Sequence, residues 1–171
     1  MMEKLRGRVW KYGDDVNTDV LFPGRYTYTV RDPKEMAAHA LEDLDPDFAA
    51  NVEPGAIVVG GRNFGCGSSR EQAAFALKYA GVTAVVAKSF ARLYFRNAIN
   101  AGLVAVANPQ VVDAVEAGDI MGIDVENGII STPKGDFSFP ALDENAMGIL
   151  EAGGLIEYAK KQIEEAKNGK V

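Results

Sequence analysis

Thiol groups are almost absent from this sequence, because Cys66 is the only cysteine among 171 residues. An intramolecular disulfide is therefore excluded. So is a zinc site or an iron-sulfur cluster held by this chain alone, since such sites take three or four thiolates or a mixture of cysteine and histidine. Histidine is equally scarce, and we interpret the single His39 as an ordinary surface or boundary residue. Any metal cluster used here must sit on another chain.

Long hydrophobic runs are also missing. The longest apolar stretches, such as residues 82–87, are interrupted by polar residues well before the ~20 positions needed to span a bilayer. Residues 1–9 lack both the apolar segment and the small-residue cleavage site of a signal peptide. We therefore predict no membrane segment and a cytoplasmic location.

Positive charge is in deficit, with a formal net charge of -6. This balance argues against nucleic acid as the main partner, because phosphate binding normally requires a basic excess. An anionic small molecule would need a local basic cluster. Hydrophobic residues make up 47% of the chain, which at this length predicts a single domain over residues 1–171 with a real core.

The hydrophobic pattern of the first two thirds predicts an α/β fold. Apolar segments typical of strands alternate with segments of helical pattern, giving a β-α-β-α-β order, which favours a mostly parallel sheet with helices packed on it. The expected strands are residues 4–11, 56–59, 83–88 and 103–106, and the expected helices between them are 69–80 and 90–100. A long polar loop, residues 14–32, separates the first strand from a short helix over 33–41 capped by Asp32.

The last third predicts mixed structure. Asn127-Gly128 is a strong hairpin signal between two apolar runs. The expected elements are a helix over 109–117, strands over 120–125 and 129–132, and helices over 144–152 and 155–166.

The glycine-rich segment 60–70 is the most informative part of the sequence. Its glycines permit backbone conformations closed to other residues and allow a ligand to approach closely. A helix start follows, and the unpaired N–H groups there favour an anion. Two hydroxyls, Ser68 and Ser69, stand at this point beside Arg70, which can hold a carboxylate with two parallel hydrogen bonds. From the residues alone, the segment predicts an anion site.

The same residues also fit a purely structural role. Ser68 with Glu71, or Ser69 with Gln72, has the spacing of a capping box, in which serine closes a helix end. Cys66 alone is more often an inert thiol than a nucleophile, since no histidine lies nearby in the sequence.

Four motifs together resemble the swivelling small domain of the aconitase superfamily. They are residues 14–24 (DDVNTDVLFPG), 63–73 (NFGCGSSREQA) and 88–92 (KSFAR), with Asn97. They occur in the order and spacing of that family across residues 7–106, and the resemblance is greatest to small subunits of the 3-isopropylmalate dehydratase type. It implies a single α/β domain of the aconitase C-terminal type, with a three-layer β/β/α arrangement.

The resemblance also implies a mechanism and a partner. A 4Fe-4S cluster is expected on a large subunit, in a heterodimer or heterotetramer, with none bound by this chain. Ser68 matches the catalytic base, while Ser69 and Arg70 match positions that hold the substrate carboxylate. A serine hydroxyl is a very poor base at neutral pH, so its alkoxide needs stabilising donors and positive charge. Residues that can shape the same field, or play a solvated or structural role, are Arg62, Lys88, Arg92 and Arg96.

The loop 14–32 resembles the family's substrate-specificity loop. Its variable part is the run Tyr26, Thr27, Tyr28 and Thr29, for which we expect contact with the variable substituent of a branched di- or tricarboxylic acid. No arginine lies inside the run, and a buried extra carboxylate without a partner is costly, so an apolar substituent is favoured. Arg25 and Arg31 flank the run, without a defined role.

The expected activity is a hydro-lyase reaction on 2- and 3-hydroxy dicarboxylic acids, with the isopropylmalates of leucine biosynthesis favoured. The hydroxyl-rich loop leaves homoaconitase-like or dimethylmalate-type dehydration open. A different class also stays open, in which the glycine-rich segment is a noncatalytic module that binds a carboxylate or phosphate.

Overall fold

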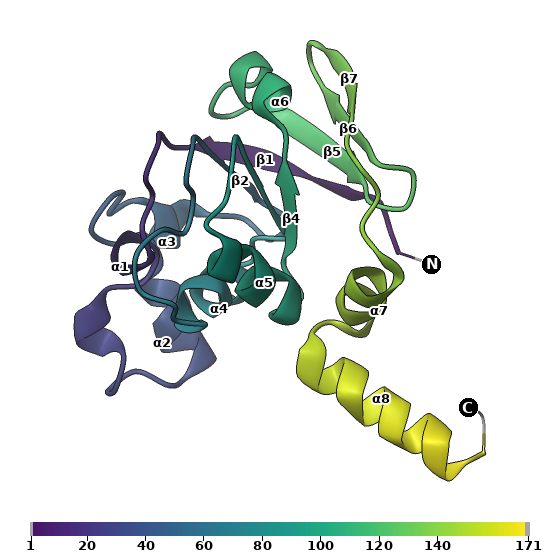
Figure 1. Ribbon diagram of the computed structural model, residues 1–171. Helices are drawn as coiled ribbons and strands as arrows, with labels where there is room; N and C mark the ends of the chain where they lie inside the picture. The colour runs from purple at the N-terminus through teal and green to yellow at the C-terminus, as the bar shows by residue number, and fades with distance from the viewer. Residues whose placement is uncertain (1, 170–171) are drawn as a thin grey trace.

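The computed structural model describes residues 2–169, and within that range seven strands form one mixed sheet (Figure 1). The strands are β1 (Leu5–Lys11), β2 (Ile57–Gly60), β3 (Ala84–Ala87), β4 (Val104–Ala107), β5 (Ile120–Asp124), β6 (Ile129–Thr132) and β7 (Gly135–Ser138). Their order is β4-β3-β2-β1-β5-β6-β7. Strands β1 to β4 pair in parallel, whereas β5 to β7 continue from β1 as antiparallel neighbours. The sheet therefore has a parallel half and an antiparallel half that share β1.

Helices cover the parallel half and extend from it. They are α1 (Thr18–Leu21), the 3-10 turn η1 (Gly24–Tyr26), α2 (Pro33–Ala38), α3 (Phe48–Asn51), α4 (Gln72–Tyr79), α5 (Arg92–Asn100), α6 (Pro109–Ala114), α7 (Glu144–Ala152) and α8 (Leu155–Lys167). Helix α4 contacts α1, α2 and α5, while α6 contacts both β3 and β6 and so bridges the two halves of the sheet. Helices α7 and α8 follow at the C-terminal end, where α8 projects from the body (Figure 1).

Strands β2 and β3 are buried along their whole length, which explains their almost entirely apolar sequences. Residue Val9 of β1 pairs with Ile57 of β2, and Ile57 pairs in turn with Ala84 of β3. Strands buried on both faces are typical of a parallel sheet covered by helices. None of the helices in residues 2–169 has the length and apolar character required to cross a bilayer.

Several helix boundaries follow directly from the sequence. The carboxylate of Asp32 accepts hydrogen bonds from the N–H groups of Lys34 and Glu35, and Pro33 occupies the first turn of α2 as predicted. The predicted hairpin is also confirmed. Strands β5 and β6 pair antiparallel, and Gly128 adopts a φ of 66° in the turn between them.

Three parts of the fold differ from the predictions. The loop 14–32 contains α1 and η1, and the short elements α3 and β7 were not predicted. Helix α4 begins at Gln72 rather than at Ser69. Elements of three or four residues carry too little periodicity to identify in a sequence. Helix α4 starts later than predicted because residues 67–71 form an open turn instead of a first helical turn.

Candidate functional site

Three loops meet at the carboxyl ends of the parallel strands. We name them the N-terminal loop (residues 14–32, after β1), the glycine loop (residues 60–70, at the end of β2) and the third loop (residues 88–91, after β3). Ligand sites in parallel sheets usually lie at this edge. Backbone hydrogen bonds fix the glycine loop between the other two: Asp15 N–H to Arg62 O (2.9 Å), Gly65 N–H to Val16 O (2.7 Å), Thr18 N–H to Cys66 O (2.9 Å), Phe64 N–H to Ser89 O (3.0 Å) and Ala91 N–H to Phe64 O (2.9 Å).

Gly65 is one of the two tightest points of this arrangement. Its φ is +80°, and a Cβ atom at this position would lie 2.0 Å from Cγ of Tyr94. The ring of Tyr94 therefore fills the space that any side chain would need. Glycine is required here both for the backbone conformation and for the close approach of α5.

We expect Gly65→Ala to lower the free energy of unfolding by about 2 kcal/mol or more, since it combines backbone strain with overpacking. Gly118→Ala is the matched control, because Gly118 also has a positive φ (+90°) but nothing within 4 Å of the added Cβ. Urea denaturation of both variants measures the difference. Equal losses would mean that the contact with Tyr94 contributes nothing.

The turn from Gly67 to Gln72 presents a row of free donors. Within residues 2–169, none of its six backbone N–H groups donates a hydrogen bond. Gly67 opens the turn with a φ of +96°, and α4 starts only at its end. Free N–H groups at a helix start attract an anion. The turn therefore offers donors to an anion, while binding of an anion there stays a prediction.

The two serines of this turn do not cap α4. The cap position is occupied by Glu71, whose side chain makes no cap hydrogen bond. Ser68 and Ser69 are exposed, and no hydroxyl hydrogen bond is formed by either of them in the described part of the chain. The capping-box interpretation is thus wrong for both serines, because Glu71 rather than a serine occupies the cap position and neither serine hydroxyl bonds to the helix. Both hydroxyls remain available to a ligand.

The side chain of Arg70 extends from the glycine loop to the N-terminal loop and links the two by hydrogen bonds. Its side chain is only 14% exposed, and its guanidinium donates to Asp19 Oδ1, to the carbonyl oxygen of Phe22 and to Thr27 Oγ1, each at 2.9 Å. A carboxylate is thus already a partner of this guanidinium. Because the Asp19 side chain is 71% exposed, its hold on Arg70 is weak and open to exchange.

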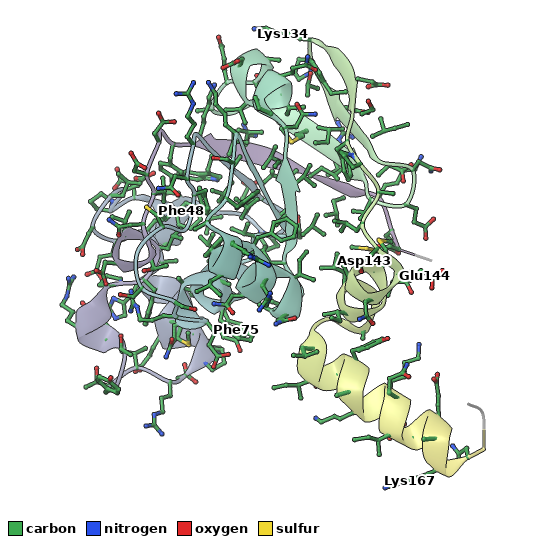
Figure 2. All side chains as sticks on the ribbon, viewed as in Figure 1. Phe48, Phe75, Lys134, Asp143, Glu144 and Lys167 are labelled. Carbon is green, nitrogen blue, oxygen red and sulfur yellow. The ribbon has the colours of Figure 1, made fainter. Side chains whose placement is uncertain are left out.

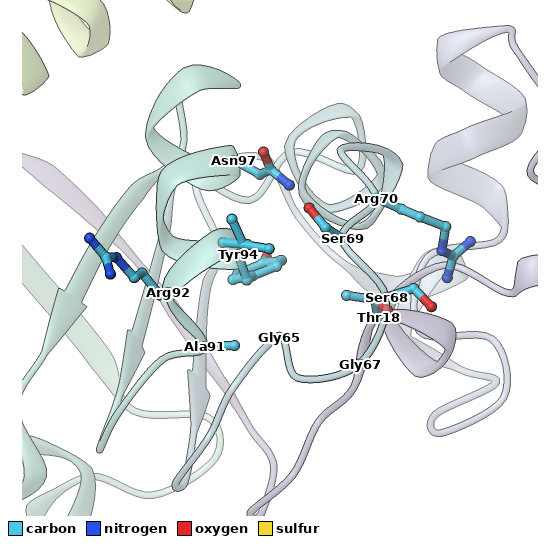
Figure 3. Close-up of a pocket in the computed structure, with 11 residues that line it drawn as sticks. Thr18, Gly65, Gly67, Ser68, Ser69, Arg70, Ala91, Arg92, Tyr94 and Asn97 are labelled. Carbon is cyan, nitrogen blue, oxygen red and sulfur yellow. The ribbon is translucent and has the colours of Figure 1, made fainter.

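A pocket of about 170 Å³ lies between the glycine loop and α5 (Figure 3). Ser69 and Asn97 extend toward it from opposite sides, whereas the guanidinium of Arg70 points away (Figure 3). Its lining also includes Thr18 and Tyr94, which sequence reasoning did not assign to the site, and the exposed Arg92. Thr18 lay inside a recognised motif, whereas nothing in the sequence distinguishes Tyr94 from an ordinary core aromatic.

The run 26–29 of the N-terminal loop does not line this pocket. Tyr26 stacks on His39 with ring centroids 3.9 Å apart, and its hydroxyl donates to Glu42. Thr27 reaches the site through Arg70, as described above. Tyr28 is 86% exposed and Thr29 is exposed. Contact of Tyr26, Thr27, Tyr28 and Thr29 with a substrate stays a prediction.

Two of the other basic residues have partners elsewhere. Lys88 forms an ion pair with Asp113 of α6 at 2.9 Å, and this contact holds the pKa of the Asp113 carboxyl below its usual value. Arg25 binds both carboxylate oxygens of Asp43 at 3.1 Å and lies over the ring of Tyr26. Arg62 and Arg96 are exposed and do not line the pocket.

The donor set of this chain does not fit an iron-sulfur cluster. No group of three or more His, Cys, Asp or Glu residues that could hold a metal ion occurs within residues 2–169. Cys66 is the only thiol, and the only histidine, His39, is engaged by Glu42 and Tyr26. Cluster ligation by these residues is chemically excluded, because a cluster needs at least three suitable ligands.

Comparison with known proteins identifies the family of this chain. Residues 18–111 match the family model of the aconitase C-terminal domain. The 3-isopropylmalate dehydratase small subunit of Hydrogenobaculum sp. (strain Y04AAS1) is 51% identical over 162 residues, covering 93% of this chain and 98% of that protein. The corresponding subunit of Aquifex aeolicus (strain VF5) is 49% identical over 166 residues, with 95% and 98% covered.

A solved structure extends the likeness to the fold. The crystal structure of 3-isopropylmalate dehydratase (leuD) from Methanocaldococcus jannaschii has a TM-score of 0.89 and 41% identity, covering 97% of this chain and 99% of that chain. The predicted α/β fold of the aconitase C-terminal type is thereby confirmed. The extent of the domain over residues 1–171 and the roles of the two loops stay predictions. The chain belongs to the 3-isopropylmalate dehydratase small-subunit family, within the aconitase C-terminal domain family.

Proposed function

We propose that this chain is the small subunit of a hydro-lyase that interconverts 2- and 3-isopropylmalate, a step of leucine biosynthesis, together with a large subunit. The observation that carries the proposal is the open turn Gly67–Gln72, in which, within residues 2–169, no backbone N–H donates a hydrogen bond and both serine hydroxyls are unpaired. Relatives that are 51% and 49% identical to this chain are named 3-isopropylmalate dehydratase small subunit, which supports the proposal.

Ser68 is the proposed base. As an alkoxide, its Oγ takes the proton from the carbon next to a substrate carboxylate, forming an O–H bond, and returns that proton when water is added back. The negative charge on Oγ requires donors that are already oriented, and we assign this role to N–H groups of the turn Gly67–Gln72, which donate no other hydrogen bond within residues 2–169. The absence of a hydrogen-bond partner for Ser68 in residues 2–169 is consistent with a group kept free for chemistry.

Ser69 and Arg70 are the proposed carboxylate ligands. The guanidinium of Arg70 already binds one carboxylate, that of Asp19, so its position suits the same chemistry with a substrate. Exchange of Asp19 for a substrate carboxylate keeps the charge of the guanidinium balanced. Its remaining contacts with Phe22 and Thr27 hold the side chain in place during that exchange.

The variable substituent of the substrate is expected to be apolar. Of the two arginines that flank the run 26–29, Arg25 is occupied by Asp43 and by the face of Tyr26. An extra substrate carboxylate, as in a homoaconitase-type reaction, would have to displace Asp43 from this arginine. This favours an isopropyl group over a second acidic arm.

The partner is a large subunit that carries a 4Fe-4S cluster. Bound there, the cluster supplies Lewis-acid chemistry to the substrate hydroxyl, and this chain supplies the base and the carboxylate ligands. Cytoplasmic location stays a prediction from the sequence.

The test is reconstitution of the chain alone and with its large subunit under anaerobic conditions. We expect no iron above background in the lone chain, because it has one thiol, and dehydratase activity only in the pair. A panel of isopropylmalate, homoaconitate and dimethylmalate substrates then identifies the substituent. A stoichiometric cluster in the lone chain would refute the two-chain assignment. An inactive pair that still binds carboxylates would indicate a noncatalytic anion-binding module.

A further inference from the structure

The antiparallel half of the sheet has one buried face and one open face. Side chains alternate between the two faces along a strand. Met121, Ile123 and Ile130 belong to the buried face, where each is at most 1% exposed. The open face carries the alternate residues of the same strands, and Ile120 and Ile129 are 39% and 38% exposed there. Figure 1 shows these strands on the side of the molecule away from α8.

One row of residues crosses the open face from β1 to β7. The strand register places its members side by side in the order Arg6, Gly122, Ser131 and Asp136. The row therefore has a positive end, a negative end and two small residues between them. Both charged side chains are exposed, and neither forms an ion pair or a side-chain hydrogen bond within residues 2–169. Three strand spacings, about 14 Å, separate them, so they cannot pair with each other in one chain.

Gly122 lies in a hollow on this face. The hollow has a volume of about 430 Å³, and all four residues of the row line it. The chain itself does not require glycine at this position, because an added Cβ would make only ordinary contacts of 3.7 Å with Leu5 O and Ser131 Cβ. A glycine inside a strand weakens that strand, and it often marks a place where another backbone approaches closely. The hollow therefore suits a second surface packed against the sheet.

We propose that this open face is the contact between two copies of this chain, packed face to face about a two-fold axis that runs along the strands between β5 and β6. This symmetry places β1 of each copy over β7 of the other. Arg6 of one copy then lies opposite Asp136 of the other, twice in each dimer, and the two hollows meet at the centre.

The charges of the row select a second copy as the occupant. Any other partner would have to present a negative group, a low centre and a positive group in the reverse order. A second copy presents that order by symmetry, because the row of this face is complementary to itself. The proposed dimer does not depend on the chemistry assigned to the glycine loop.

The test is sedimentation equilibrium of the full chain with charge-reversed variants. We expect a wild-type dimer with Kd in the micromolar range, as for a contact of modest area. Arg6→Glu and Asp136→Lys should each raise Kd about a hundredfold or more, since like charges then face each other twice. An equimolar mixture of the two variants should dimerise as the wild type does, because the new glutamate faces the new lysine. Lys161→Glu, an exposed reversal on α8, is the control and should leave Kd unchanged.

Gly122→Val provides a second measurement, because it fills the hollow without changing charge. We expect it to raise Kd about a hundredfold while the chain stays folded, since valine is well suited to a strand. A wild-type chain that is monomeric at millimolar concentration would overturn the proposal. So would a dimer that is insensitive to both charge reversals, or a mixture that fails to restore dimerisation. If the large subunit dissociates the dimer and the same variants weaken its binding, the large subunit occupies this face and the proposal is wrong.

Discussion

Replacement of Ser68 by alanine is expected to reduce kcat of the reconstituted pair by about 10²–10⁴-fold, the usual contribution of a positioned general base. The stability of the chain should hardly change. Ser68 is exposed and unpaired in the described residues, so its loss should alter the free energy of unfolding by less than about 0.5 kcal/mol. Turnover and urea denaturation on one preparation measure both effects.

Two further variants sharpen this test. Ser131→Ala, an exposed serine on β6, is the neutral control for kinetics and stability. Ser69→Ala should raise KM more than it lowers kcat, since Ser69 is assigned to carboxylate binding. If Ser69→Ala is the inactive variant and Ser68→Ala keeps its kcat, the two roles must be exchanged. Full activity of both variants would contradict a catalytic role for the glycine loop.

Replacement of Arg70 by lysine is expected to lower kcat/KM about a hundredfold or more. A lysine ammonium is a point charge and cannot reproduce two parallel hydrogen bonds to a carboxylate, each of which is worth ~1.5–3 kcal/mol. The same change removes contacts with Asp19, Phe22 and Thr27, so the free energy of unfolding should fall by about 1–2 kcal/mol. Steady-state kinetics and urea denaturation measure these two losses separately.

The control for this variant is Arg8→Lys. Arg8 is exposed and makes a single 3.3 Å hydrogen bond to the carbonyl of Gly118, so both kcat/KM and stability should stay close to the wild-type values. Near-normal kinetics in Arg70→Lys together with reduced stability would assign Arg70 a structural role only.

The parallel half of the sheet could be predicted from the sequence because β2 and β3 are short, wholly buried apolar runs, β4 is nearly so, and helices separate them. Figure 2 shows how densely side chains fill this part of the molecule, in contrast to α8, whose side chains extend away from the body. The caps of α2 and the β5–β6 hairpin were likewise predictable, because Asp-Pro and Asn-Gly act locally. Element β7 was not predictable, because a four-residue edge strand with one partly buried phenylalanine has no distinctive pattern.

The candidate site was only partly predictable. The glycine-rich segment indicated an anion site, and the family motif suggested which serine acts. The spacing of Ser68 and Glu71 favoured a capping box, but neither serine caps α4 in the structure. The backbone bonds between the glycine loop and its neighbours decide this, and such long-range contacts leave no mark on a local pattern. Tyr94 was not predicted for the same reason, because its contact with Gly65 joins positions far apart in the sequence.

The link through Arg70 has a consequence for how this fold can acquire new substrates. One guanidinium contacts Thr27 and the carbonyl of Phe22 in the loop expected to sense the substituent, and it extends from the turn that carries the proposed base. A loop transplanted from a relative with another specificity therefore arrives without its fit to this arginine. A change at Thr27 or in the backbone at Phe22 therefore also changes the contacts of the arginine beside the proposed base, so the two proposed roles are mechanically linked in this chain.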